Sequence, residues 1–351
     1  MRIALIAPLY ESVPPRYYGG TERVVSYLTE ELVKQGHDVT LFASGDSVTR
    51  ARLIPGAPRS LRLDSSCRDP LAHHLVMLER VFEDTSRFDV MHFHCDYLHF
   101  GMSRRQETPA LTTLHGRLDL PDLVPVYQTY SDAPLVSVSD AQREPLPWAN
   151  WQATVHHGLP EDLYGWTKRP GRYLAFLGRI SPEKRVDRAI EIVRRAGMQL
   201  KIAAKVDPAD EKYFEQVIKP LLDDPRVEFV GEIADGDKQA FLSNAHALLF
   251  PIDWAEPFGL VMIEAMACGT PTIAWRRGSV PEVMQHGVTG FVVESVEQAV
   301  QAVEACAGFD RAACRVTFEL RFTAERMAHD YVRVYQRLAD AREPQVTMEA
   351  C

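Results

Sequence analysis

The stretch ALLFPIDWAEPFGLVMIEAMACGTPTIA, residues 247–274, contains a short apolar run, a longer bounded segment and a second apolar run. Residues 247–250 and 272–274 have the length and composition of buried strands, and the segment between them has the pattern of a helix. Pro257 suits a first helical position, where its missing N–H costs nothing, and Gly269 suits the end of the helix. A strand, a helix and a strand in this order predict a βαβ unit of a parallel sheet.

The same alternation extends over the whole chain, which predicts parallel sheets built from βαβ units. The expected strands of the first half are residues 3–7, 38–42, 90–93, 110–113, 135–138 and 153–155, and those of the second half are residues 173–177, 200–204, 227–230, 247–250, 272–274 and 291–293. Between the halves the chain has the Gly, Pro, Lys and Arg composition of a linker. The sequence therefore predicts an α/β protein of two Rossmann-like, doubly wound domains that face each other across a cleft.

The expected domain limits follow from this pattern. We expect an N-terminal domain over residues 1–160 and a C-terminal domain over residues 161–322. The remaining segment, residues 323–351, begins with a helical stripe of apolar residues that we expect to pack back across the N-terminal domain. Doubly wound sheets bind ligands at the carboxyl ends of their strands, so the cleft between the domains is the expected site.

The composition excludes several classes of protein. Among 351 residues, 46% are hydrophobic and 25% are charged, which is ordinary for a globular protein, and no apolar run approaches the length of a membrane span. The chain opens on an expected strand without a signal-peptide pattern, which predicts a cytoplasmic location. Six cysteines without a C-x-x-C pair indicate reduced thiols, and a net charge of −9 disfavours nucleic acid as a partner.

One strip of the chain is locally basic. Its arginines are opposed only by Asp64, and they are Arg50, Arg52, Arg59, Arg62 and Arg68. A solvated surface segment is the simpler interpretation. The alternative is a weak peripheral contact with an anionic lipid or with an acidic acceptor.

Two carboxylates, Glu256 and Glu264, are separated by seven residues on what the pattern predicts to be one helix. Helical rise places them about 12 Å apart along the axis, where they would contact different parts of one elongated ligand. The N–H groups of Phe258, Gly259 and Leu260 are expected to form an anion-binding helix N-terminus between them. This layout suits a sugar, a diphosphate and a ribose. The alternative is an ordinary amphipathic helix with a capping glutamate.

Two cations follow the first expected strand of the second half. Arg179 stands at the carboxyl end of that strand, and Lys184 lies near a helix that we expect to start around Pro182. Arginine grips phosphate through two parallel hydrogen bonds and lysine adds a point charge, so the pair would stabilise a leaving diphosphate without a metal. A surface loop with an ion pair to Glu183 is the alternative.

Two further candidate segments of the first half also follow expected strands. Gly19 and Gly20 precede a helix, and their backbone amides would cradle a phosphate, although a Gly pair is more often a turn. His115 ends the strand at residues 110–113 and is therefore expected to face the cleft, either as a contact to the transferred group or as a hydrogen-bonded loop histidine.

A further group of polar residues surrounds the strand at residues 90–93. His92 and His94 share one strand face, but neither a zinc spacing nor an H-E-x-x-H helix is present, so a metal site is the weaker interpretation. Asp96 and Tyr97, which follow, are better interpreted as contacts to an acceptor. No metal ligands are therefore expected.

Taken together, these motifs resemble the retaining glycosyltransferases of family 4, which have the GT-B fold. The motifs are Gly19-Gly20, His115-Gly116, Gly178-Arg179 with Lys184, and the segment from Glu256 to Glu264. The resemblance covers nearly the whole chain, and the last segment is its most specific part. The chain departs from the family pattern at His157, where many relatives have Asn before Gly, and at Lys205, where relatives often have a Gly-rich turn.

The resemblance implies an N-terminal domain on the acceptor side and a C-terminal domain that binds the donor. The implied roles are Glu256 for hydroxyls of the donor sugar, His115 for the sugar near the anomeric carbon, Glu264 for the ribose, Arg179 and Lys184 for the diphosphate, and the turn at Ile233 for the base. These enzymes transfer a sugar from a nucleotide diphosphate sugar to an acceptor hydroxyl with retained configuration.

For this chain the resemblance implies a UDP-linked donor, with UDP-glucose as the first guess, and an acceptor that is a sugar, a lipid or a small molecule. The donor is a substrate, and no cofactor is expected. We favour front-side displacement, in which the leaving diphosphate helps to take the acceptor proton; a covalent glycosyl-enzyme is the mechanistic alternative. Two other functions remain open: a nucleotide-sugar 2-epimerase of the same fold, and a non-catalytic nucleotide-sugar binding protein.

Overall fold

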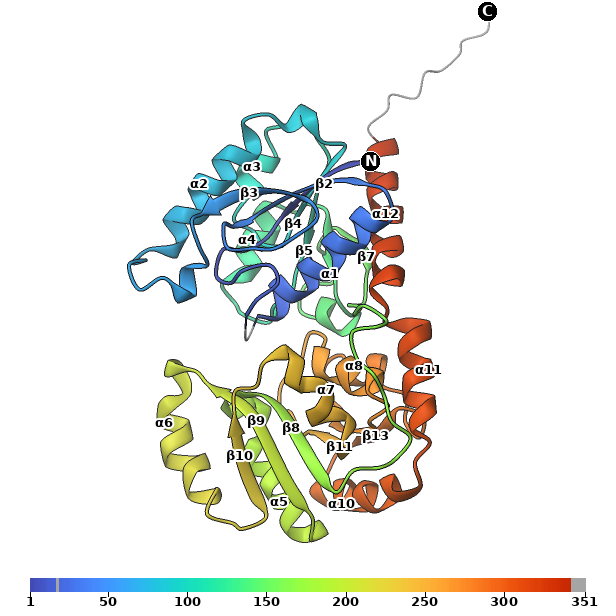
Figure 1. Ribbon diagram of the computed structural model, residues 1–351. Coiled ribbons are helices and arrows are strands. Elements are labelled where there is room, and N and C mark those ends of the chain that lie inside the picture. The colour runs from blue at the N-terminus through green and yellow to red at the C-terminus, as the bar shows by residue number, and fades with distance from the viewer. Residues whose placement is uncertain (17–18, 342–351) are drawn as a thin grey trace, which may run out of the picture.

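The computed structural model describes residues 1–16 and 19–341. Residues 17–18 of the loop before Gly19, and residues 342–351 of the predicted C-terminal segment, lie outside the described residues. The described chain forms two α/β halves, each built around one sheet, and the halves lie one above the other in Figure 1. The expected architecture of two doubly wound parallel sheets is confirmed.

The first half contains a seven-stranded parallel sheet of order β3-β2-β1-β4-β5-β6-β7. Its strands are β1 Arg2–Ile6, β2 Asp38–Ser44, β3 Arg52–Ala57, β4 Val90–Phe93, β5 Ala110–Thr113, β6 Leu135–Ser137 and β7 Trp151–Thr154. Its helices are α1 Gly20–Lys34, α2 Pro70–Phe82, α3 Phe100–Ser103 and α4 Leu123–Thr129. Strand order reverses between β1 and β4, which makes their carboxyl ends the place where such sheets bind ligands.

The second half contains a six-stranded parallel sheet of order β10-β9-β8-β11-β12-β13. Its strands are β8 Tyr173–Ile180, β9 Gln199–Val206, β10 Val227–Gly231, β11 Ala245–Phe250, β12 Thr272–Trp275 and β13 Gly290–Val293. Its helices are α5 Val186–Ala196, α6 Glu211–Tyr213, α7 Asp235–Ser243, α8 Leu260–Ala267, α9 Val280–Val283, α10 Val296–Ala305 and α11 Arg311–Arg321. Here the order reverses between β8 and β11.

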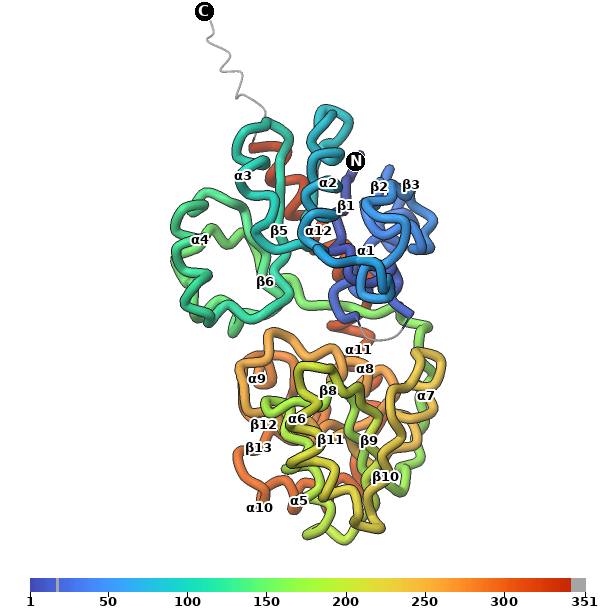
Figure 2. The backbone as a smooth tube through the Cα atoms, turned by 90° about the vertical axis from the view of Figure 1, so that its left-hand side faces the viewer, coloured from blue at the N-terminus to red at the C-terminus, as the bar shows by residue number. Residues whose placement is uncertain are grey.

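The C-terminal helix α12, Ala324–Asp340, returns to the first half. Its residues Met327, Tyr331, Val334 and Tyr335 are buried in one core cluster with residues of α1 and the first sheet. In Figure 1, α11 and α12 form a column along one side of the molecule that joins the two halves. Figure 2 shows the two halves one above the other from a second direction. Helix α12 therefore packs against α1 and the first sheet.

The chain crosses between the halves twice, and the two crossings run side by side. Leu159 N–H donates to Phe322 O at 2.9 Å, and Ala324 N–H donates to Leu159 O at 2.7 Å. A Cβ atom on Gly158 would lie 2.2 Å from Thr323 O, so only glycine permits this approach. None of the helices within the described ranges combines the length and apolar character needed to cross a bilayer.

Candidate active site

A cleft of about 710 Å³ lies between the two sheets, and every residue predicted for the site lines it. From the first half these are Gly19, Gly20, Asp96, Tyr97 and His115, and from the second half Arg179, Lys184, Ile233, Glu256, Phe258, Gly259, Leu260 and Glu264. The first group follows β1, β4 and β5, and the second follows β8, β10 and β11. The carboxyl ends of both sheets thus meet at one cavity.

The helix that carries Glu264 begins later than the sequence suggests. Gly259 is the residue before α8 and has a φ of 79°, which places it in the left-handed region and ends any helical path from Pro257. Glu256 therefore lies in the preceding loop, and the expectation that both carboxylates share one helix is wrong. The amides of Leu260 and Val261, rather than that of Phe258, occupy the first turn of α8.

Glu256 is held by two partners within the cleft. Lys184 Nζ forms an ion pair with Glu256 Oε2, and the indole N–H of Trp254 donates to the same oxygen at 3.0 Å. The Lys184 and Glu256 side chains are only 17% and 11% exposed. Lys184 Nζ also lies 5.0 Å from the centre of the Trp254 ring. A cation and a carboxylate are thus fixed side by side at the edge of the cleft.

Arg179 projects from the end of β8 and contacts two carboxylates. Its Nη2 lies 2.8 Å from Glu183 Oε1, and its Nε lies 3.5 Å from Asp210 Oδ2. The ion pair that the surface-loop interpretation anticipates is therefore present, although Arg179 also lines the cleft. A helical turn begins at Pro182 as expected, but it is a single 3₁₀ turn, Pro182–Lys184, and the α-helix α5 begins only after it.

Glu264 is almost fully buried and neutralises a lysine that sequence reasoning missed. Lys238 Nζ lies 2.8 Å from Glu264 Oε1 and 3.1 Å from Asp235 Oδ1. Asp235 in turn pairs with Arg23 of α1, so this chain of charges links the two halves. Lys238 belongs to the first turns of α7, just after the turn of Ile233, and that position was the available signal for it.

His115 belongs to a group of neutral imidazoles. His94 Nδ1 and His115 Nε2 lie 2.9 Å apart, and the His157 ring stacks on His115 with a centroid distance of 5.3 Å. Burial lowers the pKa of His115 to about 3 and lowers the pKa of His94 and of His157 well below the usual value. His157 also packs edge-on against Phe258 of the second half, 4.8 Å between centroids.

His92 takes no part in the cleft. Its two ring nitrogens lie 2.7 Å from Tyr335 Oη of α12 and 2.7 Å from Thr113 Oγ1. The metal-site interpretation of the His92 and His94 pair therefore has no support in the geometry, because the first of these residues is a core residue. The hydrogen bond between His92 and Tyr335 connects β4 to α12.

Asp96 has an unusual backbone and an unusual carboxyl group. Its φ is 49°, in the left-handed region, which non-glycine residues adopt mainly where the surroundings enforce it. Part of its side chain is exposed to the cleft, but loss of hydration among the surrounding groups raises its pKa to about 6. Tyr97 follows on the same wall. These are properties of a binding site.

The arginine strip is less basic than its sequence suggests. Arg50 pairs with Glu30 at 2.7 Å, and Arg62 pairs with the buried Glu11 at 3.0 Å. Arg62 also lines the cleft, which sequence reasoning did not anticipate. Two of the strip's charges are thus neutralised within the chain.

Comparisons with known proteins agree across both halves. The model described as Glycosyltransferase Family 4 matches residues 18–151, and the model described as Glycosyl transferases group 1 matches residues 167–307. The N-acetyl-alpha-D-glucosaminyl L-malate synthase of Bacillus anthracis is 26% identical over 95% of this chain and 97% of that protein. The phosphatidyl-myo-inositol mannosyltransferase of Mycobacterium leprae is 27% identical over 86% of each.

Solved structures share the architecture. The sucrose-phosphate synthase of Thermosynechococcus elongatus superposes with a TM-score of 0.79 at 21% identity, covering 97% of this chain and 100% of that one. Anabaena HepE in complex with UDP and glucose superposes with a TM-score of 0.74 at 16% identity, covering 96% and 100%.

Proposed function

The chain belongs to glycosyltransferase family 4 and has the GT-B fold, and from this premise we propose that it transfers a sugar from a nucleotide diphosphate sugar to an acceptor hydroxyl with retained configuration. The observation that carries this proposal is the composition of the cleft. Its second half supplies cations at Arg179 and Lys184 together with the first turn of α8, and its first half faces them with neutral His115. Cations and oriented amides suit a leaving diphosphate, and a neutral imidazole suits a sugar hydroxyl.

We assign the donor to the second half of the cleft. Glu264 accepts a hydrogen bond from the ribose, the turn at Ile233 contacts the base, and Glu256 contacts hydroxyls of the sugar. UDP-glucose is the donor we propose to test first, and the structural likeness to a protein solved with UDP and glucose supports that choice. Asp96 and Tyr97 face the acceptor from the opposite wall.

The reaction that follows is a front-side displacement. The bond between the anomeric carbon and the diphosphate oxygen breaks, the acceptor oxygen bonds to that carbon from the same face, and the acceptor proton passes to the departing diphosphate. Lys184, Arg179 and the Leu260 and Val261 amides stabilise the negative charge that develops on the diphosphate. His115 holds the sugar by hydrogen bonding while the two halves exclude water.

A panel of nucleotide sugars, incubated with the protein with and without candidate acceptors and followed by mass detection, tests this function. We expect release of a nucleoside diphosphate with one donor and formation of a glycoside when a suitable acceptor is added. An epimerised donor in the absence of acceptor would establish the epimerase instead. Donor binding without any product would establish a binding protein.

The proposed acceptor role of Asp96 predicts a pH dependence. Its ionised carboxylate accepts a hydrogen bond from a hydroxyl of the acceptor other than the attacking one, so kcat/KM should rise as the pH rises through about 6, where this group ionises. His115, with a pKa of about 3, does not titrate in this range. Asp96→Asn should lower the rate and remove this acidic limb. A limb near pH 6 that persists in the variant would contradict the assignment.

A further inference from the structure

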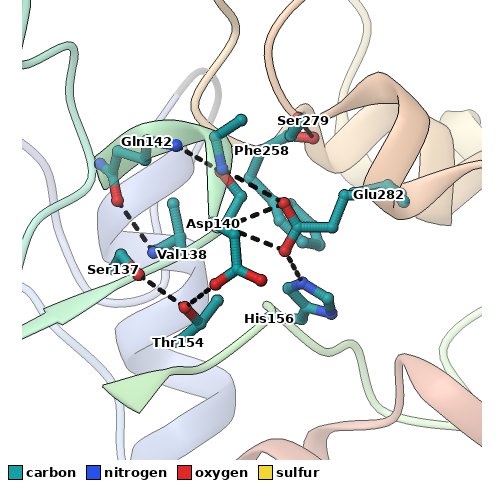
Figure 3. Close-up of polar contacts among 12 residues, drawn as sticks. Ser137, Val138, Asp140, Gln142, Thr154, His156, Phe258, Ser279 and Glu282 are labelled. Atoms are coloured by element: carbon teal, nitrogen blue, oxygen red, sulfur yellow. Dashed lines mark hydrogen bonds and ion pairs between the residues drawn. The ribbon is translucent and has the colours of Figure 1, made fainter. Parts of the chain in front are cut away.

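One turn of the first half, residues 137–143, contacts both walls of the active site, and Figure 3 shows its contacts with Glu282 of the second half. Within it Ser139 is fully buried, and its hydroxyl donates to Pro257 O at 2.6 Å. Pro257 is the residue between Glu256 and Phe258, so this bond reaches across the cleft to the segment that carries the sugar-side carboxylate. Ser139 thus joins the first half to the proposed donor site by a direct bond.

Gln142 makes the matching contacts on the other side of the same turn. Its Nε2 donates to Leu114 O at 2.9 Å and to Gly116 O at 2.8 Å, the carbonyl groups on either side of His115. Its Oε1 accepts from Val138 N at 2.9 Å, and its own N–H donates to Ser139 Oγ at 3.1 Å. The amide therefore uses both its donor and its acceptor to hold the His115 loop to the turn.

Glu282 of α9 anchors the turn from the second half. Its two carboxylate oxygens accept from Asp140 N at 2.9 Å and 2.8 Å, and Oε1 also contacts His156 Nε2 at 2.5 Å. Burial acts to raise the pKa of Glu282, but the hydrogen bonds from His156 and Asp140 outweigh it and lower the pKa. In the same region Ser279 Oγ donates to Phe258 O at 2.8 Å, as Figure 3 shows.

We propose that Ser139 and Gln142 are positioning residues that set the distance between His115 and Glu256. This inference rests on the proposed transfer reaction. His115 follows a strand of the first sheet and Glu256 follows a strand of the second. One bond from Ser139 fixes the carbonyl next to Glu256, and two bonds from Gln142 fix those next to His115. Because Gln142 and Ser139 are hydrogen-bonded to each other, a shift of the Glu256 segment moves the His115 loop with it.

Loss of these hydrogen bonds should lower kcat for transfer rather than weaken the binding of the nucleotide. The contacts proposed for the nucleotide lie mainly in the second half, at Glu264, Arg179 and Ile233, and only the phosphate contact of Gly19 and Gly20 comes from the first half. A displacement of about 1 Å between reacting groups costs on the order of 10²-fold in rate, whereas it leaves contacts within one half unchanged. The positioning role therefore predicts a loss in kcat with an unaltered affinity for the free nucleoside diphosphate.

The test compares the wild type with Ser139→Ala and with Gln142→Glu, which removes the two amide donors but keeps an acceptor for Val138. We expect kcat for transfer to fall roughly 10- to 100-fold in each, with the dissociation constant for UDP within about two-fold of wild type. Thr29→Val is the matched control, because it removes a buried hydroxyl that donates to Val25 O at 2.7 Å within α1. Its kcat should not change.

A double-mutant cycle with His115→Ala separates positioning from general destabilisation. If Ser139 acts through His115 and Glu256, Ser139→Ala should cost little in the His115→Ala background, because effects of residues that act as a unit are not additive. Wild-type kcat in both turn variants, or fully additive losses, would overturn the positioning role and leave the transfer reaction standing. Absence of transfer by the wild type with every donor would overturn both.

Discussion

Replacing Lys184 by alanine is expected to lower kcat/KM for sugar transfer by about 10²- to 10³-fold, the range observed when one preorganised group that stabilises transition-state charge is removed. Lys184 Nζ is the cation nearest to Glu256, and its side chain is largely shielded from solvent. The variant loses the positive charge that faces the departing diphosphate. It also leaves the Glu256 carboxylate without its ion-pair partner in a desolvated position.

Glu256→Ala should lower kcat/KM for sugar transfer by a similar factor, but for a different reason. The carboxylate holds Lys184 in place and, in the proposed complex, accepts hydrogen bonds from the sugar. Because the two residues act as a pair, the losses in the double variant should be less than additive. Steady-state kinetics with the active donor, together with thermal unfolding to confirm an intact fold, is the measurement.

Lys212→Ala provides the control for these variants. Lys212 is exposed on α6 and does not line the cleft, so its removal should leave kcat/KM unchanged. Near-normal turnover in Lys184→Ala or in Glu256→Ala would contradict the site assignment, and an equal loss in Lys212→Ala would indicate a general charge effect instead.

The buried strands were predictable because strands of a parallel sheet are covered on both faces and read as continuous apolar runs. All residues of β4 and β12 are buried, for example, and both agree with the expected ranges to within one residue. β3 was not predicted. It lies at the edge of its sheet, its N-terminal part is only partly buried, and it contains Pro55 and Gly56, which weaken any strand pattern.

The residues of the candidate site were predictable where they follow strand ends, and this is true of Arg179, His115 and Asp96. The helix start at Pro257 was wrong because proline suits a first helical position on local grounds, whereas the left-handed conformation of Gly259 depends on the surrounding fold. Ser139 and Glu282 gave no local signal. They become neighbours of the site only when the two halves pack together, since Ser139 and its partner Pro257 are 118 positions apart in the sequence.

Lowering the pH from 7 to 5.5 is expected to reduce the free energy of unfolding by about 1 kcal/mol for each histidine that the fold keeps neutral. Burial lowers the pKa of each of these side chains far below its usual value, and they are His92, His94, His99, His115 and His157. In the unfolded chain a histidine binds a proton near pH 6.5, whereas His99 and His115 in the fold do so only near pH 3.

The unfolded state therefore binds more protons over this range, and the stability that these residues contribute is present above pH 6.5 and is lost as the pH falls. Four carboxyl groups whose pKa is raised by burial act in the opposite direction but are fewer than the histidines, and they are Glu11, Glu22, Asp96 and Asp210. Urea unfolding at pH 7.5, 6.5 and 5.5 measures the slope. His99→Gln should reduce that slope by nearly one proton. An unfolding free energy that stays constant between pH 7 and pH 5.5 would show that the folded chain takes up as many protons as the unfolded chain, which would contradict neutral imidazoles at His94 and His115.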